Sequence, residues 1–283
     1  MLRQAMVTAW FRATTAVGSV ALLALAGVAS CDAKTQGGAD DSTLAQSDSG
    51  PVADKYVPEI DEGLGASIAI LIDNSGSMRE VAEGDSRPKY LVAREAIEAM
   101  LASTDSFVAR QPGFPINVGL YRFSSRVTPM AAVAKYDRSV LVAALDAMPE
   151  PDGGTAIGSA MDAARADLYR AGTFRKYILV VTDGENTQGI SPRRIAREIN
   201  RRSEGAVRMY FVAFDIDAER FAFVRDVRGE VVGARNGDAL RERLDEIYRG
   251  KILSEAVDAG ETHPAAADSA ARDTVPRPTN PRR

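Results

Sequence analysis

The chain has 283 residues, 45% of them hydrophobic, so it is long enough for one sizeable domain with appended segments. Its 35 basic and 39 acidic residues give a net charge of −4, so no excess of positive charge indicates nucleic-acid binding. The single histidine, His263, leaves little material for histidine-based catalysis or a zinc site, so a metal here would have to be held by oxygen ligands.

Residues 1–30 have the layout of a secretory signal peptide. Arg3 and Arg12 precede an apolar stretch rich in small residues, which ends in the letters VASC at residues 28–31. This ending resembles the bacterial lipobox, in which the cysteine, here Cys31, is lipidated and becomes the mature N-terminus. The alternative is an uncleaved anchor helix with a free thiol. Under either interpretation we expect the protein to be exported across the inner membrane and tethered to the cell envelope, on its periplasmic or surface face.

Two segments of low hydrophobicity flank the predicted domain. Residues 31–63 consist largely of Gly, Asp, Ser, Ala and Gln, which is typical of a flexible linker. Residues 256–283 are rich in Ala, Pro, Asp, Thr and Arg, and this composition predicts a disordered tail. The folded domain is therefore expected over residues 64–255.

The domain begins with the sequence ASIAILIDNSGSM at residues 66–78. An apolar run without alternation predicts a strand covered on both faces, as in a parallel sheet flanked by helices. The run ends at Asp73, and Ser75 and Ser77 follow in a turn that Gly76 can adopt at low steric cost. We interpret the stretch as a central strand that opens into a metal-binding loop.

The elements that follow alternate between helices and strands. They are a helix over residues 88–103, strands over 115–123 and 127–133, a helix over 139–148, a helix that ends at 171, a strand over 175–182, a helix from 191, a strand over 207–214, a helix over 218–228, a strand over 230–234 and a helix over 238–255. The short join between the second and third strands predicts an antiparallel hairpin. Thr155 stands at the expected N-cap of the helix that ends at residue 171.

This pattern predicts an α/β fold: a doubly wound, Rossmann-like open sheet of about six mostly parallel strands, with one antiparallel edge strand and helices on both faces. In a sheet with strand order 3-2-1-4-5-6, the first and fourth strands flank the switch point, where ligands bind at the carboxyl ends. These two strands end in Asp73 and Asp183, and Thr155 lies in a loop before the fourth strand. We therefore expect all three side chains to converge.

Three short motifs on these elements resemble the metal-ion-dependent adhesion site of a von Willebrand factor type A (vWA) domain. They are Asp-x-Ser-x-Ser at residues 73–77, Thr155 after a Gly-Gly turn, and Thr-Asp-Gly-Glu at residues 182–185. The likeness covers about residues 64–255. It implies that Ser75, Ser77 and Thr155 bind a cation directly, and that Asp73 and Asp183 act largely through water.

The chemistry of these side chains favours a hard cation. Hydroxyl and carboxylate oxygens suit Mg²⁺, with Mn²⁺ as a second possibility. Neutral hydroxyl ligands leave the ion electrophilic, so it would accept an acidic side chain of a protein ligand. The alternative is that the threonine and the second aspartate only cap helices or turns and that the serines fill a polar turn.

These features predict a membrane-tethered, divalent-cation-dependent module for adhesion or protein interaction, which binds a partner carboxylate through Mg²⁺. The alternative is an accessory vWA subunit of a multiprotein cell-envelope complex, such as an ATPase-linked, secretion or protease assembly. We do not expect an enzyme, because the sequence indicates no base or nucleophile near the site.

Overall fold

The computed structural model describes residues 63–255. The signal peptide over residues 1–30, the lipidation site Cys31, almost all of the linker, and the tail over residues 256–283 lie outside this range and stay predictions. No helix within the described range is both long enough and apolar enough to cross a bilayer.

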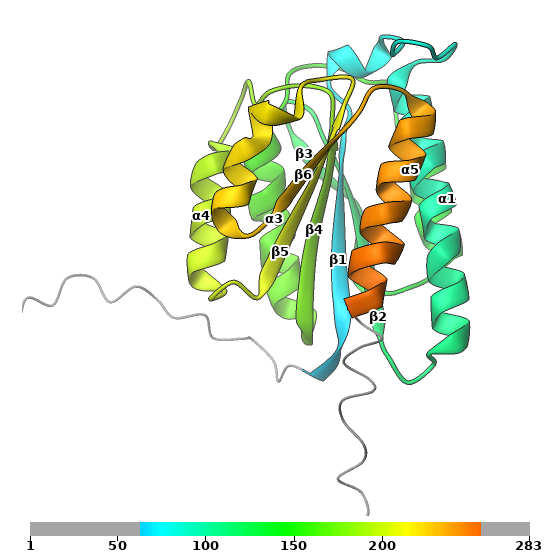
Figure 1. The fold of residues 1–283 in the computed structure, drawn as a ribbon, viewed down its shortest axis with the longest axis vertical. Helices are drawn as coiled ribbons and strands as arrows, with labels where there is room; N and C mark the ends of the chain where they lie inside the picture. The colour runs from blue at the N-terminus through cyan, green and yellow to red at the C-terminus, as the bar shows by residue number, and fades with distance from the viewer. Residues whose placement is uncertain (1–62, 256–283) are drawn as a thin grey trace, which may run out of the picture. The chain divides into compact units, whose positions relative to one another are not determined.

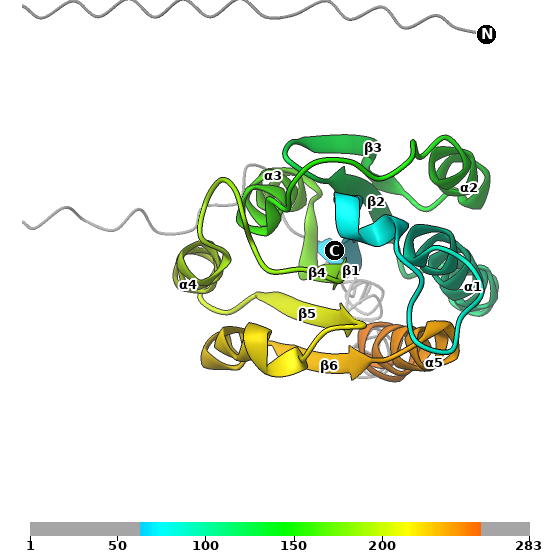
Figure 2. The same ribbon diagram turned by 90° about the horizontal axis from the view of Figure 1, so that it is seen from above.

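Six strands form one sheet in the order β3-β2-β1-β4-β5-β6 (Figures 1 and 2). Their bounds are β1 (Gly63–Asp73), β2 (Ile116–Phe123), β3 (Val127–Lys135), β4 (Thr173–Thr182), β5 (Val207–Phe214) and β6 (Glu230–Ala234). Neighbouring strands pair in parallel except β2 and β3, which form an antiparallel pair at one edge. The predicted fold class and strand order are confirmed.

Helices cover both faces of the sheet, as Figure 2 shows in the view from above. One face packs against α1 (Lys89–Arg110), α2 (Arg138–Asp146), α5 (Gly237–Ile247) and the π-helical segment η3 (Tyr248–Leu253). The other packs against α3 (Ile157–Arg170), α4 (Pro192–Arg202) and the 3₁₀ segment η2 (Ala218–Val227). A short 3₁₀ turn, η1 (Gly76–Arg79), is separated from the end of β1 by two residues. Each face therefore contributes its own hydrophobic core.

Strand β1 lies at the centre of both cores. Ile68, Ile70 and Ile72 point into the core under α1, α2 and α5, whereas Ala69 and Leu71 point into the core under α3 and α4. All five side chains are fully buried. The apolar run lacks alternation because each face of this strand is covered by helices.

Some element boundaries differ from the sequence prediction. Helix α1 continues to Arg110, because Thr104 and Phe107 extend its buried stripe and Phe107 packs edge-on against Phe114. The segment after residue 217 is a 3₁₀ helix rather than an α-helix. The N-cap assignment of Thr155 is wrong, since Ala156 occupies that position without a side-chain cap. Thr155 lies in the preceding loop, which leaves its hydroxyl available for other contacts.

Candidate metal site

Asp73 is the last residue of β1, and its carboxylate is buried at the carboxyl end of the sheet. One carboxylate oxygen, Oδ1, accepts a hydrogen bond from the backbone N–H of Ser75 at 2.8 Å. The other, Oδ2, accepts one from the hydroxyl of Thr182 at 2.5 Å. Asp73 therefore ties its own loop to the end of β4, the neighbouring strand.

The two serines of this loop contact each other, and Ser77 also contacts Asp183, which follows β4. The Oγ atoms of Ser75 and Ser77 are 3.2 Å apart. The Ser77 hydroxyl donates to Oδ1 of Asp183 at 2.8 Å, across 106 residues of sequence. Serine hydroxyls and an aspartate from two adjacent strands are thus in direct contact.

Thr155 reaches the same place from the loop between α2 and α3. A Cβ atom added to Gly184 would lie 3.5 Å from Oγ1 of Thr155 and 3.8 Å from Oγ of Ser77. Both hydroxyls therefore border one small space beside Gly184. The fold brings together all five residues that the sequence singled out, while their role as metal ligands remains a prediction.

Backbone hydrogen bonds hold the Thr155 loop against the β1 loop. Gly76 N donates to Gly153 O at 3.0 Å, and Asp152 N donates to Asn74 O at 2.9 Å. The backbone N–H of Thr155 also donates to the hydroxyl of Thr187, in the loop after β4, at 2.9 Å. Gly153 has a φ of +78°, and a Cβ there would lie 2.6 Å from Oγ of Ser125. A glycine is needed at this position because both its conformation and its packing leave no room for a side chain.

Two charged residues at this edge escaped the sequence analysis. Lys89, the first residue of α1, is 4% exposed, and its Nζ lies 3.1 Å from Oδ2 of Asp183 and 3.0 Å from Oδ2 of Asp215. Oε2 of Glu80 lies 3.7 Å from the same Nζ atom of Lys89. Asp215 had a detectable signal, since it follows β5 just as the other two aspartates end or follow their buried strands. Lys89 had none, because lysine in a first helical turn is usually solvated.

The electrostatics of the site are dominated by burial. Burial raises the pKa of Asp73 to about 6; hydrogen bonds from Ser75 and Thr182 oppose this shift, and the charge of Asp183 adds to it. Burial also raises the pKa of Asp183, against the effects of Ser77 and Lys89. For both carboxylates, burial therefore outweighs the contacts that favour the charged form.

Lys89 behaves in the opposite way from an ordinary buried lysine. Burial alone lowers the pKa of Lys89, but the hydrogen bond to Asp215 and the charge of Asp183 outweigh it, so the pKa lies above its usual value. Lys89 is therefore a buried cation held by two carboxylates.

The donor set fits a hard divalent cation. No group of three or more His, Cys, Asp or Glu side chains within residues 63–255 is arranged to hold a metal by itself. The available ligands are instead the hydroxyls of Ser75, Ser77 and Thr155, with Asp73 and Asp183 beside them. Oxygen donors of this kind suit Mg²⁺ or Mn²⁺ better than softer metals. A cation would also supply the positive charge that the two buried carboxylates lack.

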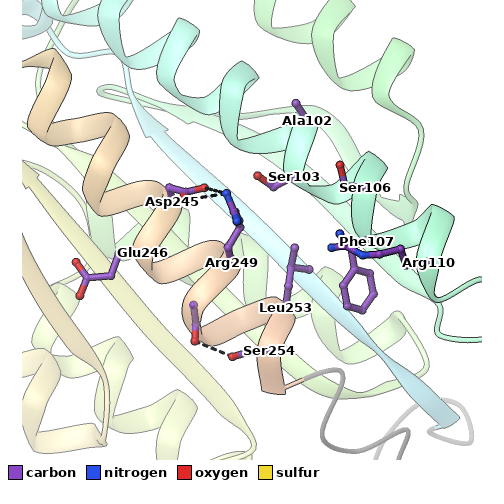
Figure 3. A pocket seen from close by; sticks show the side chains of 11 residues that line it. Ala102, Ser103, Ser106, Phe107, Arg110, Asp245, Glu246, Arg249, Leu253 and Ser254 are labelled. Carbon is purple, nitrogen blue, oxygen red and sulfur yellow. Dashed lines mark hydrogen bonds and ion pairs between the residues drawn. The ribbon is translucent and has the colours of Figure 1, made fainter.

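A separate cavity of about 720 Å³ lies between α1 and the α5–η3 segment (Figure 3). Its lining includes Ser103, Phe107 and Leu253, together with Arg249, which pairs with Asp245. At 1.5 Å per helical residue, the α1 part of this cavity begins roughly 20 Å along the helix from Lys89. The cavity is therefore distinct from the sheet-edge site.

The family model of the von Willebrand factor type A domain matches residues 67–241, which is more than half of the chain. The chain belongs to this family. A sequence search of curated proteins returned no match. The match to the vWA family model agrees with the observed strand order and with the helices on both faces of the sheet.

Solved structures share the vWA fold at low sequence identity. The PilB minor pilin from Streptococcus sanguinis superposes with a TM-score of 0.57 at 15% identity, over 70% of this chain and 63% of the pilin. A von Willebrand factor type A protein from Catenulispora acidiphila gives 0.53 at 20% identity, over 66% and 42%. Proximal thread matrix protein 1 from the mussel byssus, with a zinc-occupied MIDAS motif, gives 0.53 at 16% identity, over 66% and 48%. This chain thus spans less than two thirds of the length of each.

Proposed function

We propose that this vWA domain is a divalent-cation-dependent protein-binding module, that its cation is Mg²⁺ or Mn²⁺, and that its partner offers a Glu or Asp carboxylate. The observation that carries the proposal is the convergence of Ser75, Ser77 and Thr155 with two buried aspartates at one sheet edge. One neighbour is a minor pilin and another carries zinc at its MIDAS motif, and both are compatible with such a module.

The side chains of the site have separate tasks in this proposal. Ser75, Ser77 and Thr155 would hold the cation through neutral oxygens, and Asp73 and Asp183 would act largely through water. When bound, the cation supplies a Lewis-acidic position that attracts a partner's carboxylate. The hydrogen bonds from Ser75 N and from the Thr182 hydroxyl fix the orientation of the Asp73 carboxylate.

We propose binding rather than catalysis. The site is built from hydroxyls and carboxylates that are already engaged in hydrogen bonds, and Lys89, which could otherwise serve as a base, is held by Asp183 and Asp215. This arrangement supports docking of an acidic group better than bond cleavage.

Isothermal titration with Mg²⁺ tests the metal site directly. We expect saturable binding to the native chain and none to the double variant Ser75→Ala plus Ser77→Ala. The pair Ser103→Ala plus Ser106→Ala is the matched control, because these serines line the distant α1 cavity (Figure 3). Equal Mg²⁺ binding by the native chain and the Ser75/Ser77 variant would overturn the proposal.

The partner can be sought by crosslinking and capture in Mg²⁺ and in EDTA. We expect capture of an acidic protein ligand in Mg²⁺ alone, and identical partner lists would remove the cation from the mechanism. Stoichiometric partners recovered from the protein's own membranes would instead indicate an accessory subunit of an envelope complex.

We also propose that Cys31 carries a lipid that tethers the domain to the cell envelope, on its exported face. The sequence VASC at residues 28–31 supports this. Metabolic labelling with a radioactive fatty acid should mark the native protein and not Cys31→Ser. Unlabelled native protein that stays in the membrane fraction would favour the uncleaved anchor helix.

A further inference from the structure

Lys89 occupies a position that is unfavourable for a lysine. It is the first residue of α1, where the helix dipole repels positive charge, and the first turn of α1 has no acidic residue. It is also 4% exposed, and burying an ammonium group is costly unless it is well paired. Because both the helix dipole and burial disfavour a lysine here, its presence at the edge of a candidate site indicates a role in that site.

The contacts of Asp183 divide its carboxylate between two partners. Oδ1 accepts from the hydroxyl of Ser77, on the side of the predicted metal ligands. Oδ2 faces Lys89 at 3.1 Å. Lys89 therefore restrains the oxygen of Asp183 that does not face the serines, and it supplies a positive charge close to where the cation would bind.

Asp215 is the second partner of Lys89 and contacts none of the predicted metal ligands in the described hydrogen bonds and ion pairs. It has a φ of +54°, which is uncommon for a residue other than glycine, and its backbone N–H donates to Ala234 O at 2.7 Å. This strained position places its carboxylate 3.0 Å from Nζ of Lys89. Asp215 therefore neutralises part of the lysine charge without entering the site.

We propose that Lys89 is a positioning residue that keeps Asp183 out of direct coordination with the cation, and that Asp215 tunes this effect. The proposal rests on the function proposed above. With Asp183 restrained, the cation is held less tightly but keeps more of its charge for a partner's carboxylate. Lys89 thus lowers the affinity of the site for the cation and raises the affinity of the bound cation for a partner's carboxylate.

Lys89→Met removes the charge and retains most of the side-chain volume. We expect Mg²⁺ to bind about tenfold more tightly by isothermal titration, a change typical of coupling between sites. We expect the Mg²⁺-loaded variant to bind an N-acetyl-Gly-Glu-Gly-amide peptide about tenfold more weakly, for the same reason. A purely structural role would weaken both interactions, so opposite signs show that Lys89 acts on the site through its charge. The number of waters on bound Mn²⁺ then decides whether it also positions Asp183.

Proton relaxation of water around bound Mn²⁺ gives a spectroscopic readout. If Asp183 enters direct coordination in Lys89→Met, it replaces a bound water. We therefore expect a smaller number of exchangeable waters on Mn²⁺ in the variant than in the native chain. An unchanged number of waters would overturn the positioning role even if both affinities shift.

Asp215→Asn tests the same idea without altering Lys89. The lysine charge is then less neutralised, so we expect Mg²⁺ to bind several-fold more weakly than in the native chain. Adding Asp215→Asn to Lys89→Met should have no further effect, because the charge through which it acts is gone. Lys251→Met is the matched control, since it removes another lysine paired with a carboxylate, Glu230, and should leave Mg²⁺ affinity unchanged.

The outcomes separate this inference from the proposed function. If the native chain binds no Mg²⁺, both fail. If the native chain binds Mg²⁺ but Lys89→Met leaves both affinities unchanged or weakens both, the positioning role is overturned and the proposed function stands. If Lys89→Met does not fold, Asp215→Asn decides, and unchanged Mg²⁺ affinity in that variant overturns the inference.

Discussion

Buried polar groups gather at both ends of the central strands of the sheet, and the two clusters differ in their chemistry. In the amino half, Ser67 Oγ lies 2.7 Å from Thr173 Oγ1, and Asn117 Nδ2 donates to Ser67 Oγ at 3.2 Å. Asn117 also donates to the carbonyl of Ala171. These groups are neutral and satisfy one another, so the cluster joins the strands and needs nothing further.

The carboxyl cluster is charged and incompletely compensated. Asp73 and Asp183 are buried, Asp215 lies beside them, and Lys89 is the ammonium group that pairs with two of the three. Burial is the largest cause of the raised pKa values of Asp73 and Asp183, and for Asp183 the charge of Lys89 opposes the shift without cancelling it. Buried charge occurs at both ends of the sheet, since the amino end holds Lys176, whose Nζ donates to Thr173 O at 2.5 Å. The carboxyl end differs because its buried charged groups include two carboxylates whose pKa values are raised by burial.

The largest expected effect on stability comes from a substitution at Gly158, where α3 packs closely against the loop that follows β4. A Cβ atom at Gly158 would lie 2.1 Å from the carbonyl oxygen of Ile190, so Gly158→Ala must displace the loop that holds Thr155. We expect a loss of about 3 kcal/mol in the free energy of unfolding by urea titration. Gly113→Ala is the control, since its Cβ would meet nothing within 4 Å. Equal stability of the two variants would contradict this packing.

Asp73→Asn tests whether the buried charge of the carboxyl cluster destabilises the metal-free protein. An asparagine can accept from Ser75 N through its oxygen and donate from its amide nitrogen to the Thr182 hydroxyl, which can then donate to Gly184 O. The substitution removes the buried charge. In EDTA at pH 7 we expect the variant to be more stable than the native chain by about 2 kcal/mol, because the raised pKa marks a destabilised carboxylate. Added Mg²⁺ should stabilise only the native chain. A less stable variant in EDTA would show that the charge of Asp73 is already compensated.

The pH dependence of the metal-free protein follows from the same carboxylate. The pKa of Asp73 is about 6 when folded, above its ordinary value of 3.8, so between these values the folded state binds more protons than the unfolded state. Stability should therefore fall as pH rises through this window, by at most about 1.4 kcal/mol per pH unit from this group. Asp183 raises this pKa further, and Lys89 faces Asp183 rather than Asp73.

Urea titrations in EDTA at several pH values between 4 and 7 measure this dependence. We expect a smaller fall in stability for Asp73→Asn than for the native chain, while Ser67→Ala should follow the native chain. Parallel curves for all three proteins would contradict the assignment of the pH effect to Asp73.

The smallest effect is expected in the neutral cluster. Ser67→Ala removes a hydroxyl that contacts Thr173 and Asn117, and we expect a loss of about 1 kcal/mol in the free energy of unfolding. Mg²⁺ affinity should not change, because the cluster lies away from the carboxyl ends of the strands. A change in Mg²⁺ affinity comparable to that of a site variant would mean that the two ends are coupled.

Local sequence patterns were sufficient to predict most of the fold. Apolar runs without alternation identified the buried strands, and the order of strands and helices led to the sheet order and to the convergence of Asp73 and Asp183 at the switch point. Element boundaries depended on contacts between distant residues. The end of α1 depends on Phe107 packing against Phe114, and the misassigned cap at Thr155 depends on contacts with a loop more than thirty residues away.

The sequence by itself determined which strands are buried and which oxygen-bearing side chains lie at their ends, because these properties depend on hydrophobic period and chain order. Only the tertiary structure decided that Lys89 is buried between Asp183 and Asp215. Lys89 and Asp183 are 94 residues apart, and no local pattern encodes that pairing. Its physical basis is the packing of α1 against the sheet, which brings the start of the helix to the carboxyl ends of β4 and β5.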